Sequence, residues 1–188
     1  MQDLHTYFDT LNSALKTVSP ADVDRASAIL ADAYQDDRTV FVIGNGQSAT
    51  TASAFALDLT KQTRTPGLAR RFRVLALTDN TAALTAWAND ESYDAIFTEQ
   101  LDGLFRPGDV VVAVSASGNS PNVLAAAGWA RDHGGRVIAL TGFEGGKIDA
   151  LADVNLIVRI ADYGHVETAH LAIMHYWVDL FREKLAQP

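Results

Sequence analysis

One stretch constrains the fold of this chain more than any other, residues 110–130, which read VVVAVSASGNSPNVLAAAGWA. The first five, Val110–Val114, are apolar without alternation, which is typical of a strand covered on both faces of a parallel sheet. A turn rich in Ser, Gly and Asn follows, and then a helix with Ser120 as its expected N-cap and Pro121 at its first position. The stretch therefore predicts a strand, a polar turn and a helix, the repeating unit of α/β folds.

The turn gathers hydroxyl groups at the start of that helix. Ser115, Ser117 and Ser120 lie within six residues of one another, which is more hydroxyl groups than one cap requires. The first N–H groups of a helix lack intrahelical partners, and the helix dipole places partial positive charge there, so this geometry attracts phosphate. We therefore favour an anion site, with a turn that only caps the helix as the ordinary alternative.

The composition excludes several classes of protein. With 188 residues, 48% of them hydrophobic and 20% charged, the chain matches an ordinary globular protein, and we expect one domain over residues 1–188. A net charge of -8 argues against a general nucleic-acid or anionic membrane surface. No cysteine is present, which excludes disulfides, thiolate zinc clusters and a cysteine nucleophile. Because neither a signal peptide nor a run of transmembrane length is found, we expect a cytoplasmic location.

The rest of the chain repeats the strand and helix pattern. Two amphipathic helices, residues 4–18 and 20–34, form a leading helical pair over residues 1–36, and an α/β core follows over residues 37–188. Four further apolar runs are expected strands, at residues 39–43, 73–78, 136–141 and 154–160. Five strands that alternate with helices predict a doubly wound parallel sheet with right-handed crossovers.

Polar loops follow three of the expected strands, at residues 44–48, 78–80 and 115–120. Ligands of open parallel sheets lie beyond the carboxyl ends of the strands, so these loops are expected to converge on one site. The first loop, GNGQSA, also fits a GxGxxA pattern, but no acidic residue marks the end of the second strand, where a dinucleotide's ribose would be held. A nicotinamide site is therefore not expected.

The last helix, expected from about residue 165 to 185, carries several ionisable side chains. Glu167, His170 and His175 fall within an arc of about 140° at 3.6 residues per turn, so they could line one wall of a site. A histidine on such a helix is often only a hydrogen-bonded structural residue. Both interpretations are open from the spacing alone.

Four segments are similar to the SIS (sugar isomerase) domain and, within it, to the phosphoheptose isomerases: GNGQSATTASAFALDL, TDNTAALTAWANDESYDAIFTEQL, RPGDVVVAVSASGNSPNVLAAA and VETAHLAIMH. The resemblance runs from about residue 40 to 180. It implies a flavodoxin-like sheet and a homotetramer with active sites between subunits. It also implies conversion of sedoheptulose 7-phosphate to an aldose, D-glycero-D-manno-heptose 7-phosphate, through an enediol in heptose biosynthesis, with both epimers formed at C2.

The resemblance also implies roles for particular residues of this chain. The phosphate-binding serines of the family match Ser48, Ser115, Ser117 and Ser120. The substrate-binding set further includes Asn45, Gly46, Asp79 and Asn119. The acid/base residues match Asp58, where the family usually has Glu, and His175, with Glu167 at a position that is usually Gln.

One position departs from the family pattern in a way that affects metal binding. The family commonly has a histidine one turn before the acid at position 58, but this chain has Ala54 there, and a methyl group cannot be a ligand. Asp58, Glu167 and His175 could still hold zinc, with weaker affinity. A site that works without metal, and a site without activity, are the alternatives.

An aldose–ketose isomerase needs one group that moves a proton between C1 and C2, another that moves protons between the two oxygens, and an anchor for the phosphate. Asp58 or Glu167 together with His175 are the expected acid/base residues, and the serines are the expected anchor. A non-catalytic SIS module that binds a phosphosugar or a protein is the second hypothesis. A third is an isomerase of another ketose phosphate, since Gln47, Ala54 and Tyr163 are expected in or near the pocket.

Overall fold

The computed structural model describes residues 3–64, 67 and 70–186. The first two residues of the expected helical pair (1–36) and the last two of the expected α/β core (37–188) therefore lie outside the described part. Its elements in chain order, with η for a 3-10 helix, are α1 (Leu4–Leu15), α2 (Pro20–Gln35), β1 (Thr39–Gly44), α3 (Gln47–Gln62), β2 (Arg73–Ala76), α4 (Thr81–Asp90), η1 (Tyr93–Ala95), α5 (Thr98–Leu104), β3 (Val110–Val114), α6 (Pro121–Asp132), β4 (Arg136–Gly142), η2 (Lys147–Ala150), β5 (Val154–Val158) and α7 (Tyr163–Ala186).

The strands form one parallel sheet in the order β2-β1-β3-β4-β5. This is the flavodoxin-like order of a doubly wound sheet, and it confirms the fold class expected from the sequence. The central strand β3 is buried at every residue, as its unbroken apolar run predicts. The order of the strands reverses between β1 and β3, so the connections that leave these two strands diverge.

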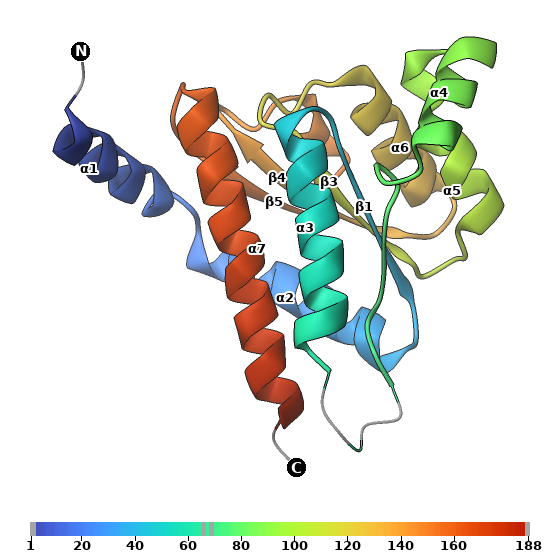
Figure 1. The fold of residues 1–188 in the computed structure, drawn as a ribbon, viewed down its shortest axis with the longest axis horizontal. Helices are drawn as coiled ribbons and strands as arrows, with labels where there is room; N and C mark the ends of the chain where they lie inside the picture. The colour runs from blue at the N-terminus through green and yellow to red at the C-terminus, as the bar shows by residue number, and fades with distance from the viewer. Residues whose placement is uncertain (1–2, 65–66, 68–69, 187–188) are drawn as a thin grey trace.

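Helices cover both faces of the sheet, and alternate strand residues feed two apolar clusters. On one face, α2, α3 and α7 pack on side chains such as Val40, Val112 and Leu140. On the other, α5, α6 and η2 pack on side chains such as Phe41 and Val111. In Figure 1, α3 and α7 lie side by side in front of the sheet, and α4, α5 and α6 lie on its other side.

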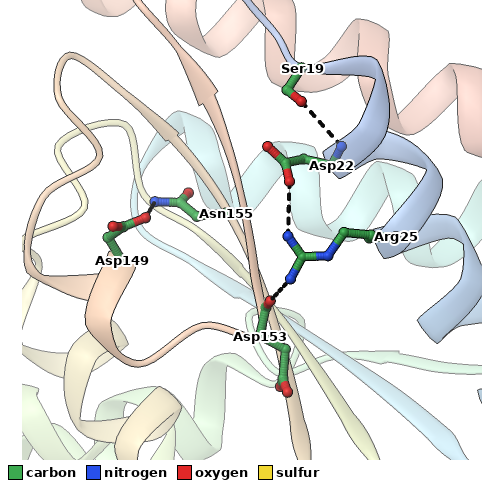
Figure 2. A network of polar contacts seen from close by, with 6 residues as sticks. All are labelled: Ser19, Asp22, Arg25, Asp149, Asp153 and Asn155. Carbon is green, nitrogen blue, oxygen red and sulfur yellow. Dashed lines mark hydrogen bonds and ion pairs between the residues drawn. The ribbon is translucent and has the colours of Figure 1, made fainter.

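The two leading helices differ in what they cover. Helix α2 packs on the sheet, and Arg25 ties its first turns to the start of β5 by donating to the Asp22 carboxylate at 3.1 Å and to the Asp153 carbonyl at 2.8 Å, as Figure 2 shows. Ser19 caps the same helix by accepting from the Asp22 N–H at 3.3 Å. Helix α1 extends away from the sheet and packs against α7 (Figure 1). Its Phe8 side chain is 54% exposed.

The boundaries of short elements differ from the sequence expectation. Between α4 and β3 the chain forms η1 and then α5, with Ile96 and Phe97 buried between them. The first helix ends at Leu15 rather than residue 18, and the last begins at Tyr163. The burial of two bulky side chains at a bend outweighs local helix propensity there. None of the helices in the described ranges is long and apolar enough to cross a membrane.

Candidate functional site

The candidate site lies where the strand order reverses. Strand β1 ends at Gly44 and pairs there with Val114, the last residue of β3. Helix α3, which follows β1, packs on one face of the sheet, and α6, which follows β3, packs on the other. The two turns therefore separate above the sheet edge and leave a hollow, as is general at the switch point of such sheets.

Four serines line this hollow, and we call them the serine cradle: Ser48 from the start of α3, and Ser115, Ser117 and Ser120 from the turn before α6. They share a cavity of about 200 Å³ whose remaining lining residues are Asn45, Val114, Ala116, Tyr163 and Glu167. The structure thus brings together six of the residues predicted from the sequence: Asn45, Ser48, Ser115, Ser117, Ser120 and Glu167.

The cradle hydroxyls are held within the protein but keep capacity for a ligand. Ser48 and Ser115 are only 5% and 4% exposed, and the Ser115 and Ser120 hydroxyls lie 3.2 Å apart. Ser120 stands at the N-cap position of α6, as predicted, yet its side chain makes no capping hydrogen bond. Ser120 therefore does not act as a simple cap: its hydroxyl pairs with that of Ser115, and the residue lines the cavity.

The cradle turn is braced by the segment after β4. The Gly142 N–H donates to the Ala116 carbonyl at 2.8 Å, and the Ile148 N–H donates to the Gly118 carbonyl at 3.1 Å. Gly118 has φ +63°, and a Cβ there would meet the Gly145 carbonyl oxygen at 2.1 Å, so only glycine fits. Asn119 belongs to this brace, since it accepts from the Lys147 N–H at 3.0 Å and donates to the Ser117 carbonyl at 2.8 Å.

Asn119 is therefore not among the residues that line the cavity, contrary to the sequence prediction; it shapes the turn that carries the serines. Two other predicted substrate-binding residues also lie outside the lining. Gly46 is exposed at the start of α3. Asp79, beyond β2, accepts a short hydrogen bond from Ser53 on α3.

The predicted acid/base residues Asp58 and His175 form a second centre. The Asp58 Oδ2 and His175 Nε2 atoms lie 3.7 Å apart where α3 packs against α7. The His175 side chain is 57% exposed and that of Asp58 is 23% exposed. Their chain neighbours Leu57 and Tyr176 are 61% and 49% exposed. Ten residues along α3 separate Asp58 from Ser48, a rise of about 15 Å.

A zinc site built from Asp58, Glu167 and His175 does not fit this geometry within one chain. Glu167 lines the serine cradle, eight residues and about 12 Å along α7 from His175. Over residues 3–64, 67 and 70–186, no three His, Cys, Asp or Glu side chains gather closely enough to hold a metal ion. The arc on a helical wheel places these residues on one side of α7 but ignores the rise along its axis.

His170 is not part of either centre. It is 1% exposed, and its Nε2–H donates to the Thr141 carbonyl at 3.0 Å. Its Nδ1 atom is buried without a hydrogen-bond partner. Burial lowers the pKa of His170 from 6.5 to about 4, and the Thr141 hydrogen bond opposes this shift. The structural interpretation is therefore confirmed for this histidine, and the proposed wall of three ionisable groups is wrong.

The start of α7 places the wall of the cavity that carries Tyr163 and Glu167. The Asp162 carboxylate accepts from the His165 N–H at 2.9 Å and from His165 Nδ1–H at 2.7 Å. These hydrogen bonds, the backbone one first, hold the pKa of Asp162 below its usual value. Tyr7 of α1 packs its ring on His165 with centroids 4.5 Å apart. Helix α1 thus supports the end of α7 nearest the cavity.

Sequence reasoning missed two residues that hold the cavity's polar edge. The Asn122 amide exchanges hydrogen bonds with Asn45, and the Tyr93 hydroxyl donates to the same asparagine at 3.0 Å. For Asn122 the sequence offered a signal, because an asparagine stands directly after Pro121 in the first turn of a helix. Tyr93 lies 48 residues from Asn45 and carried no local signal. Tyr163 was expected near the pocket and does line it, whereas Gln47 is exposed outside the lining.

Comparison with known proteins gives a consistent set of relatives. The model of the SIS domain matches residues 6–142. A phosphoheptose isomerase from Citrifermentans bemidjiense is 37% identical over 183 residues, covering 97% of this chain and 93% of that protein. A phosphoheptose isomerase from Geobacter sulfurreducens is 41% identical over 158 residues, covering 84% of this chain and 82% of that protein.

The likeness extends to solved structures. The structure of phosphoheptose isomerase GmhA from Neisseria gonorrhoeae superposes with a TM-score of 0.87 at 32% sequence identity, covering 96% of this chain and 97% of that one. Sequence and structure therefore agree over nearly the whole chain, including both turns of the cradle.

Proposed function

Because this chain belongs to the SIS domain family and matches phosphoheptose isomerases along most of its length, we propose that it is an aldose–ketose isomerase of sedoheptulose 7-phosphate. The product is D-glycero-D-manno-heptose 7-phosphate, formed through an enediol. The single observation that carries the proposal is the serine cradle, in which hydroxyls from two turns meet in one cavity at the switch point of the sheet.

The cradle suits the phosphate end of the sugar. Two helices, α3 and α6, begin at its rim, so the partial positive charge of both helix dipoles faces the same hollow. Hydroxyl groups of Ser115, Ser117 and Ser120 supply donors that can rotate toward phosphate oxygens. With a net charge of -8, the chain needs such local recognition rather than a basic surface. An anchored phosphate fixes the position of the reacting carbons.

The reaction needs two proton transfers at the other end of the sugar. A carboxylate, Asp58 or Glu167, takes the C1 proton of the ketose, which leaves an enediol, and the same group returns a proton to C2. His175 moves the O1 proton to O2, so an aldehyde forms at C1 and a hydroxyl at C2, and no electron donor or acceptor is required.

We infer that the Asp58–His175 pair of one chain acts on the sugar held by the cradle of a neighbouring chain, in a homotetramer. The pair lies about 15 Å along α3 from Ser48 of its own chain. Leu57 on α3 and Tyr176 on α7, the chain neighbours of the pair, are large exposed apolar side chains of the kind that a second copy would cover. A cytoplasmic location completes the proposal, because a charged sugar phosphate remains in the compartment where it is made.

A panel of C5 to C7 ketose phosphates, followed by NMR, tests the reaction and its substrate. We expect turnover of sedoheptulose 7-phosphate and much slower turnover of the shorter sugars. No turnover of any of them would overturn the isomerase proposal.

Mixing chains that carry Ser115→Ala, Ser117→Ala and Ser120→Ala together with chains that carry Asp58→Asn tests the shared site, at a sugar concentration at which neither parent protein shows measurable turnover. Mixed oligomers regain activity if one chain's cradle works with another chain's pair. They stay inactive if each site is built within a single chain, which would contradict the shared arrangement.

One observation favours a second candidate, a non-catalytic module that binds phosphosugars. Ala54 stands one turn before Asp58, where the resemblance implies a histidine, and no metal cluster forms among the described side chains. Such a module would bind sedoheptulose 7-phosphate through the same cradle and return it unchanged. Thermal stabilisation by the sugar phosphate without any product would support this candidate over the isomerase.

A further inference from the structure

A polar network at the edge of the cavity joins the two turns of the serine cradle. Asn45, from the turn after β1, and Asn122, from the first turn of α6, exchange side-chain hydrogen bonds of 2.8 and 2.9 Å. Asn122 is 1% exposed, whereas Asn45 lines the cavity. Tyr93, from η1, reaches the same asparagine from a third part of the chain.

A backbone group fixes the direction of every hydrogen bond in this network. The Val123 N–H can only donate, and it donates to Asn122 Oδ1 at 3.0 Å. Asn122 must therefore present its Nδ2 group to Asn45 Oδ1, and Asn45 returns a bond from its own Nδ2 to Asn122 Oδ1. Since the Asn45 Oδ1 atom accepts, the Tyr93 hydroxyl donates to it at 3.0 Å.

These hydrogen-bond directions leave Asn45 able only to donate a hydrogen bond into the cavity. A carbonyl oxygen has two lone pairs, and those of Asn45 Oδ1 are taken by Asn122 and Tyr93. One of its two Nδ2 hydrogens is bound to Asn122, which leaves the other N–H for a ligand. Asn45 is thus a donor only, and the ligand atom beside it is an acceptor oxygen.

We propose that Asn122 and Tyr93 are positioning residues that lock the Asn45 amide so that it donates to an oxygen of the sugar. This inference rests on the proposed sugar-phosphate function and goes beyond it. Both residues act through Asn45: Asn122 is buried beneath it, and Tyr93 is 58% exposed on η1, outside the cavity lining. Without them, the amide could rotate and present its oxygen to the sugar, which would repel an acceptor.

The test compares two probes, inorganic phosphate and sedoheptulose 7-phosphate, in titrations of the whole chain. Tyr93→Phe removes one donor to Asn45 Oδ1, and Asn122→Ala removes the other donor without adding a charge beside the cavity. We expect affinity for the sugar phosphate to fall about three- to tenfold in the first and about ten- to a hundredfold in the second. Affinity for inorganic phosphate should stay within about twofold of the wild type.

A matched control is Tyr34→Phe, which loses a hydroxyl bonded at 3.3 Å to the Arg70 carbonyl, away from the cavity. It should bind both probes like the wild type. If the Tyr93 and Asn122 variants lose as much affinity for phosphate as for sugar phosphate, the two residues have only a structural role. Unchanged sugar-phosphate affinity in both variants would also overturn this inference, while leaving the proposed function intact. A wild-type chain that binds neither probe would overturn the proposed function and this inference together.

Discussion

Asn45 and Asn122, 77 residues apart, exchange two hydrogen bonds and so fix the distance between the turns that follow β1 and β3. Each turn begins a helix that packs on a different face of the sheet. The cradle serines come from both turns, so their separation depends on this link.

Removing a cradle hydroxyl should weaken phosphate binding. In Ser117→Ala the cavity loses a donor, so affinity for inorganic phosphate should fall about three- to tenfold in a calorimetric titration. Ser13→Ala is the matched control, because its hydroxyl only donates to the Asp9 carbonyl within α1. Equal affinities in the two variants would place the phosphate elsewhere.

Replacing the acid/base pair should slow the chemistry and leave binding largely intact. We expect His175→Ala and Asp58→Asn each to lower kcat about 10²- to 10⁴-fold with sedoheptulose 7-phosphate, while the affinity for phosphate stays the same. Asp179→Asn, one turn further along α7 in a surface ion pair with Arg182, serves as the control and should keep full activity. Full activity of both pair variants would exclude their assignment.

The brace behind the cradle should be sensitive to a single methyl group. Gly118→Ala forces a Cβ to within 2.1 Å of the Gly145 carbonyl oxygen at a positive φ, so the free energy of unfolding should fall by about 2–4 kcal/mol in urea denaturation. Gly128→Ala lies in the middle of α6 with open space around the added carbon and should instead stabilise by about 0.5–1 kcal/mol. A Gly118→Ala protein as stable as the wild type would contradict the observed packing.

His170 should make the protein less stable in mild acid. The folded protein keeps His170 neutral down to about pH 4, whereas the unfolded chain takes up the proton near pH 6.5. The unfolded state therefore binds more protons between these values, and the free energy of unfolding falls as the pH falls through this window, by at most about 3 kcal/mol from this group.

The variant His170→Gln keeps a donor for the Thr141 carbonyl but does not titrate. Urea unfolding of both proteins between pH 7 and pH 4 measures the effect, and the variant should lose less stability than the wild type over that range. Identical pH profiles would show that His170 is protonated in the folded protein near its usual pKa.

The fold could be predicted from the sequence because its strands are short, mainly apolar runs bounded by polar turns. The run Val110–Val114 (β3) and the runs that form β1, β2, β4 and β5 are enough to predict a parallel sheet. The break between η1 and α5 could not be predicted, because the burial of Ile96 and Phe97 depends on the helix α6 that packs beside them.

The cradle could be predicted from the two serine turns, since both follow adjacent strands. What each residue does within them depends on longer-range contacts. Asn119 supports the turn because η2 reaches it from 28 residues away, and Tyr93 reaches Asn45 from 48 residues away. Such pairings follow from the packed fold and leave no periodic pattern in the sequence.

The most direct test of the account follows hydrogen at the reacting carbons. The wild-type chain is incubated with sedoheptulose 7-phosphate in D₂O, and the sugar is followed by NMR. Proton transfer through an enediol predicts an aldose phosphate that carries deuterium at C2. Recovery of the ketose alone, with no aldose phosphate formed and no deuterium at C1 under conditions where the sugar demonstrably binds, would contradict the isomerase account.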